Sequence, residues 1–123
     1  MKKILIVEGQ AEIRKLLRLT LGSAQRQLTE AVDGASGWEA VLRDRPDIVL
    51  LDIMMPGDPD GLQLRQRIKS DPQTAHAKVV LVSARGHRND VVIGRQAGAD
   101  DYLLKPFSPQ RLVEVVEALG AVS

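Results

Sequence analysis

Four polar residues of this sequence stand where short apolar runs end. Each directly follows its run: Glu8 after Ile4–Val7, Asp52 after Ile48–Leu51, Ser83 after Val79–Val82 and Lys105 after Tyr102–Leu104. If the runs are parallel strands of one sheet, the four side chains converge on the edge where open α/β sheets bind ligands. Two carboxylates, a hydroxyl and an ammonium group suit phosphoryl transfer. Asp52 would be the nucleophile, and a magnesium ion would gather the acids and shield the phosphate.

The segments between the runs have helical spacing, so strand and helix patterns alternate along the chain. Helices are predicted over residues 11–21, from Asp33-Gly34, from Leu62, over residues 89–97 and from Ser108-Pro109. Residues 28–32 form a weaker strand with the character of a sheet edge. Five β-α units in a row predict an α/β fold, a doubly wound five-stranded parallel sheet with helices on both faces and right-handed crossovers.

Length and composition point to one ordinary globular domain over residues 1–123. The chain has 123 residues, of which 44% are hydrophobic, and a net charge of +1. This balance gives no basic stripe for direct nucleic-acid binding and no polybasic tail for a membrane surface. No cysteine is present, which excludes disulfides and thiolate chemistry. No segment approaches the roughly 18 apolar residues of a membrane span, so we expect no membrane association and a cytoplasmic location.

Together, the motifs resemble the receiver domains of two-component response regulators and are similar to the single-domain chemotaxis regulator CheY. The resemblance covers the whole chain. The motifs that carry it are Ile4-Leu5-Ile6-Val7-Glu8, Asp52-Ile53-Met54-Met55-Pro56-Gly57, Ser83-Ala84, Gly98-Ala99-Asp100-Asp101-Tyr102 and Lys105-Pro106-Phe107. The resemblance implies a (βα)5, flavodoxin-like fold with strand order 2-1-3-4-5. It also implies a role in signal transduction through a phosphorelay.

The resemblance assigns a role to each residue at the strand ends. Asp52 matches the phosphoacceptor, which receives its phosphoryl group from a histidine kinase or a phosphotransfer protein. Residues that match the family's magnesium site are Glu8, Asp52 and, through its backbone carbonyl, Met54. Residues that match the phosphate-binding and switch positions are Ser83, Ala84, Tyr102 and Lys105. The Lys105-Pro106 peptide bond is expected to be cis, an isomer that proline makes accessible.

In the family, phosphorylation reshapes the face formed by the last two helices and the strand between them. Here that face is made from residues 87–119, and it would signal to a downstream protein or to a fused output domain. A weak homodimer through the same face is a further expectation. Its usual charged pairs are missing, because the corresponding residues are Val91, Arg111 and Val115, so an apolar partner surface would replace them.

One departure from the family pattern bears directly on the chemistry. Receiver domains usually carry two consecutive acids after the first strand, and the second binds the metal directly. Here that position is Gly9, which weakens the predicted magnesium site. Asp58, in a loop one residue longer than the usual pattern, or the longer side chain of Glu8 would partly replace the missing ligand.

Three functions therefore remain open at the level of sequence. The first is a phosphorylation switch at Asp52. The second is a pseudo-receiver, an interaction module that works without phosphorylation because of Gly9. The third is a small phosphatase, which is disfavoured because Met54 stands where a general acid would be needed. In the first two cases the domain is not an enzyme, apart from slow autodephosphorylation.

Overall fold

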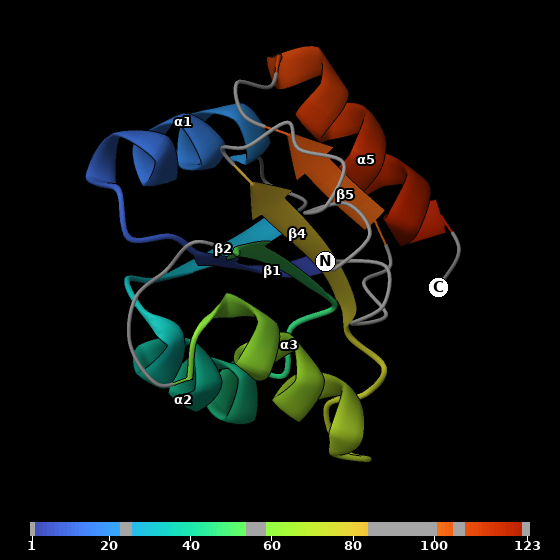
Figure 1. The fold of residues 1–123 in the computed structure, drawn as a ribbon. Helices are drawn as coiled ribbons and strands as arrows, with labels where there is room; N and C mark the ends of the chain where they lie inside the picture. Colours follow the sequence, from blue (N-terminus) through green and yellow to red (C-terminus); the bar gives the residue numbers. More distant parts are fainter. Residues whose placement is uncertain (1, 23–25, 54–58, 84–100, 105–107, 122–123) are drawn as a thin grey trace.

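A computed structural model of the chain shows a parallel sheet between two layers of helices (Figure 1). It describes residues 2–22, 26–53, 59–83, 101–104 and 108–121. The strands are β1 (Lys2–Val7), β2 (Arg26–Ala31), β3 (Ile48–Asp52), β4 (Lys78–Ser83) and β5 (Asp101–Leu104). The helices are α1 (Ala11–Leu21), α2 (Gly34–Asp44), α3 (Gly61–Ser70) and α5 (Pro109–Ala121). The helix predicted over residues 89–97 lies outside the described residues.

The sheet has five strands in the order β2-β1-β3-β4-β5, and every neighbouring pair is parallel. Both the predicted fold class and the predicted strand order are confirmed. The chain steps outward from β1 to β2 and then returns to the other side of β1 to form β3. The carboxyl ends of β1 and β3 therefore flank the switch point of the sheet, which is where such sheets place their ligands.

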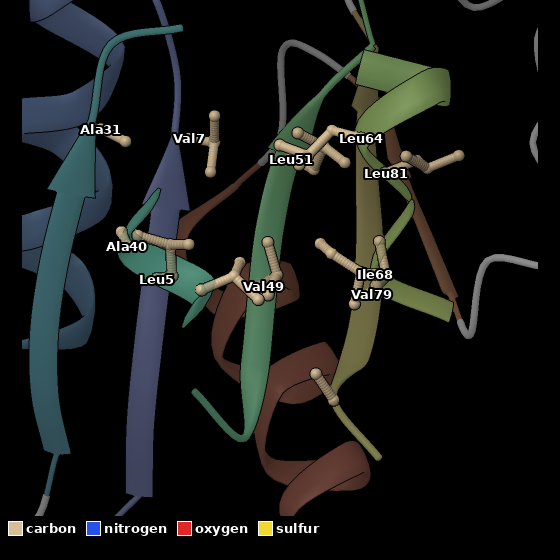
Figure 2. Close-up of a cluster of buried hydrophobic side chains, with 12 residues drawn as sticks. Leu5, Val7, Ala31, Ala40, Val49, Leu51, Leu64, Ile68, Val79 and Leu81 are labelled. Carbon is tan, nitrogen blue, oxygen red and sulfur yellow. The ribbon is translucent and has the colours of Figure 1, made fainter. Parts of the chain in front are cut away.

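Alternate side chains of the strands fill two separate cores, because successive residues of a strand point to opposite faces. One core packs under α2 and α3, and the other packs under α1 and α5. Figure 2 shows that the first core forms two rows across the sheet. The lower row holds Leu5, Val49 and Val79, and the upper row, next to the carboxyl ends, holds Val7, Leu51 and Leu81.

Helices α2 and α3 both begin at a capping box, which fixes where each helix starts after the carboxyl edge of the sheet. The Asp33 carboxylate accepts from the Ser36 backbone N–H at 2.8 Å, and the Asp60 carboxylate accepts from that of Gln63 at 2.9 Å. The hydrogen bonds from the backbone and hydroxyl of Ser36 lower the pKa of Asp33. Asp33 and Asp60 therefore act as N-caps of α2 and α3.

The prediction that Val115 belongs to an apolar partner surface is wrong. This side chain is 1% exposed and packs in the core under α1 and α5. A buried position of this kind suits an apolar side chain and is closed to a partner surface. On the same helix, the Arg111 guanidinium lies 3.9 Å from the Glu114 carboxylate. Val91 lies outside the described residues.

None of the helices in the described part of the chain is long and apolar enough to cross a membrane.

Leu64 tests whether α3 is held by the core beneath it. Its side chain is fully buried, so Leu64→Ala leaves a cavity and should lower the free energy of unfolding by about 2–5 kcal/mol in urea titrations. Leu19→Ala is the matched control, because Leu19 is 68% exposed on α1 and its truncation should change that free energy by less than about 0.5 kcal/mol. Equal losses in the two variants would contradict the described packing.

Candidate functional site

Glu8 and Asp52 meet at the switch point of the sheet. Glu8 directly follows β1, Asp52 is the last residue of β3, and the register pairs Val7 with Leu51. Glu8 therefore lies level with Asp52 on the neighbouring strand, and neighbouring strands run about 4.8 Å apart. Both side chains are buried, with 2% of Glu8 and 7% of Asp52 exposed. The sequence prediction that these two acids share one edge is confirmed.

The backbone around both acids continues the hydrogen bonding of the sheet. The Glu8 backbone N–H donates to the Ala31 carbonyl at 3.0 Å, which extends the ladder between β1 and β2. The Ile53 backbone N–H donates to the Val82 carbonyl at 2.9 Å, which extends the ladder between β3 and β4. The two carboxylates are thus carried on rigid elements, as a preorganised site requires.

The other predicted site residues are only partly described. Val82 pairs with Asp52, so Ser83 follows one residue further along the same edge, and Leu104 of β5 pairs with Ser83. The backbone of Tyr102 lies in β5, opposite Leu81. The remaining predicted residues lie outside the described residues: Met54, Asp58, Ala84, Lys105 and Pro106, with the expected cis bond.

Gly9 has no structural need to be glycine. Its φ lies outside the left-handed region that favours glycine, and a Cβ added there would meet the Val32 carbonyl oxygen at 3.5 Å, an ordinary contact. The turn could therefore carry a side chain without rearranging. Neither the φ angle nor the space at the Cβ position requires glycine here.

The donor set of the site suits a hard cation such as magnesium, which prefers carboxylate and carbonyl oxygens. Glu8 and Asp52 supply two buried carboxylates, whereas Gly9 supplies none. Among the described residues, no three His, Cys, Asp or Glu side chains gather into a metal-binding group. The residues present therefore fit magnesium with one direct carboxylate fewer than the family pattern.

Two glycines allow close backbone packing near Asp52 and at Pro59, and the sequence prediction did not identify this role. A Cβ on Gly61 would clash with the Asp52 carbonyl oxygen, and one on Gly34 would clash with the carbonyl oxygen of the buried Pro59. The backbone of α3 thus packs directly on the end of β3, and Pro59, before α3, packs on the start of α2. In the sequence, both glycines look like ordinary turn residues.

Arg14 is a second residue that the sequence prediction missed. From α1, its Nη1 atom donates to the Glu8 carbonyl at 2.8 Å and to the Gly9 carbonyl at 3.1 Å. The guanidinium therefore holds the backbone of the turn that carries Glu8. Its sequence signal is weak, because a basic residue in an amphipathic helix is usually part of a solvated face.

Comparison with known proteins places this geometry in a family. The model of the response regulator receiver domain matches residues 4–117. The chain is 36% identical over 118 residues to the phosphate regulon transcriptional regulatory protein PhoB of Pseudomonas aeruginosa, which covers 96% of this chain and 51% of that protein. The chain thus spans about half the length of this curated relative.

Solved structures agree with this match. A candidate response regulator from Chloroflexus aurantiacus superposes with a TM-score of 0.91 at 32% identity, covering 98% of each chain. The BeF3-activated N-terminal receiver domain of RstA from Klebsiella pneumoniae superposes with a TM-score of 0.85 at 30% identity, covering 95% of this chain and 97% of that one.

The same substitution at Gly61 and Gly9 should have opposite effects. Gly61→Ala forces α3 away from the Asp52 backbone and should lower the free energy of unfolding by about 1–3 kcal/mol. Gly9→Ala fits the existing turn and should raise that energy by about 0.4–1 kcal/mol, because alanine restricts the unfolded chain. Urea titration measures both changes. A destabilised Gly9→Ala variant would contradict the described turn.

Proposed function

We propose that this chain, which belongs to the response regulator receiver domain family, accepts a phosphoryl group on Asp52 as a signalling switch. The observation that carries the proposal is the pair of buried carboxylates, Glu8 and Asp52, at the ends of adjacent strands. The donor would be a histidine kinase or a phosphotransfer protein. The domain, over residues 1–123, would have no enzymatic activity beyond slow loss of its own phosphoryl group.

In this proposal each residue has a defined task. An Asp52 oxygen attacks the phosphorus, the O–P bond forms, and the N–P bond of the donor's phosphohistidine breaks with its electron pair going to the imidazole. Lys105 offsets the negative charge, and the Ser83 hydroxyl donates to a phosphoryl oxygen. When bound, magnesium neutralises charge on the incoming group, and Glu8, Asp52 and the Met54 carbonyl would hold it.

The output would use the face that contains β5 and α5. The backbone joins this face to the site directly, because β4 ends at Ser83 and pairs with β5. A phosphoryl group on Asp52 would draw Ser83 and Ala84 toward it, and Tyr102 would turn inward. Since the PhoB relative is a transcriptional regulatory protein about twice as long, we propose that a fused output domain or a separate cytoplasmic partner reads this change.

A second function is favoured by Gly9. The backbone of the turn accepts a Cβ at an ordinary contact distance, yet the position carries no acid to bind a metal. A pseudo-receiver that binds partners without being phosphorylated would have this feature. The two functions differ in whether Asp52 is chemically competent.

Phosphorylation competence is tested with a small phosphodonor and magnesium. We expect the intact mass to increase by one phosphoryl group, and Asp52→Ala to abolish the increase because it removes the accepting oxygen. Intact-protein mass spectrometry measures both. An adduct that survives in Asp52→Ala would exclude this acceptor, and repeated turnover of a phosphate ester would instead indicate a phosphatase.

Gly9→Asp separates the two candidate functions. The added carboxylate should raise the affinity for magnesium at least about 10-fold, measured by isothermal titration calorimetry, since ligand charge sets the strength of such sites. Gly9→Asn is the matched control, with a similar shape and no charge. An adduct that forms only in Gly9→Asp would support the pseudo-receiver, whereas an adduct in the natural chain would support the switch.

A further inference from the structure

We propose that Arg14 is a positioning residue for the cation site: it fixes the backbone of Glu8 and Gly9 and, through it, the Glu8 carboxylate. The inference rests on the proposed function, because it concerns the same magnesium site. It assigns a role to a residue of α1 that does not itself bind the cation.

Arg14 of α1 forms hydrogen bonds with the backbone directly after β1. One terminal nitrogen, Nη1, donates to two successive carbonyl oxygens, at 2.8 Å on Glu8 and 3.1 Å on Gly9. A single nitrogen bonded to two successive carbonyls sets how those peptide groups are turned relative to each other. Hydrogen bonds from a charged donor are about twice as strong as neutral ones.

The glycine makes this restraint more important. Glycine has the widest backbone freedom of any residue, and here it directly follows the buried acid. The two hydrogen bonds from the Arg14 guanidinium would restrict the backbone of the turn between β1 and α1. A receiver domain with an ordinary residue at this position would be less dependent on such a restraint.

The guanidinium is itself held in place from β2. The Arg14 Nε atom lies 3.7 Å from a Glu30 carboxylate oxygen, and the other oxygen of Glu30 lies 3.0 Å from the Arg18 guanidinium. Arg14 is the more buried of the two arginines, with 19% of its side chain exposed against 49% for Arg18. Both pair with Glu30, and the turn carbonyls are bonded by Arg14. Arg18 is therefore a matched control.

The first experiment measures the turn without metal. We expect Arg14→Met to speed hydrogen exchange of the Glu8 backbone amide, which donates to the Ala31 carbonyl, by roughly 10-fold, while the amides of β3 keep their protection. Arg18→Met removes the other arginine that pairs with Glu30 and should leave exchange of the Glu8 amide within about 2-fold of the natural chain, since a surface pair contributes little. Adding Gly9→Ala to Arg14→Met should recover part of the protection, because alanine restrains the same backbone.

The second experiment measures magnesium binding by isothermal titration calorimetry. Arg14→Met should weaken the affinity about 10-fold, the lower end of the range for groups that support metal ligands, and Arg18→Met should not. Unchanged exchange in Arg14→Met, equal loss of affinity in both variants, or no magnesium binding by the natural chain would each overturn the proposal. Normal magnesium binding with no phosphoryl adduct would overturn the proposed switch alone and leave the role of Arg14 supported.

Discussion

The register between β1 and β3 is the constraint on which the rest of the site depends. It pairs Val7 with Leu51, so the acids that follow these residues lie level on neighbouring strands. A shift by one residue would turn every side chain of β1 to the opposite face and bring Leu5 and Val7 out of their core. The packing of the core fixes the register because Val7 lies in one row with Leu51 and, beyond it, Leu81, as Figure 2 shows. The position of the acids therefore follows from the packing of apolar residues.

Because Glu8 and Asp52 are buried, the site favours positive charge nearby. Two carboxylates beside each other in a buried setting require cations or hydrogen-bond donors to stabilise their charge. The other acids at this edge, Asp33 and Asp60, are engaged as helix caps. In the proposed function, a divalent cation and the amine of Lys105 would supply this positive charge beside Glu8 and Asp52.

The pattern of apolar residues was enough to predict most of the fold. It did not predict the contacts that involve the backbone. Short apolar runs ending in polar residues were enough to predict the parallel sheet, its edge strand β2 and the meeting of Glu8 with Asp52. The roles of Gly34, Gly61 and Arg14 were missed, because each acts through a carbonyl oxygen and leaves no periodic pattern. Val115 was assigned to a partner surface from the family resemblance, whereas its apolar side chain is buried in the core.

The ordinary backbone at Gly9 has an evolutionary consequence. Some glycine codons differ from an aspartate codon by one base, and a Cβ at this position makes only an ordinary contact with the Val32 carbonyl oxygen. The missing acid could therefore be regained in a single mutational step that leaves the fold intact. Selection could therefore change the strength of cation binding at this site without a backbone rearrangement of the turn.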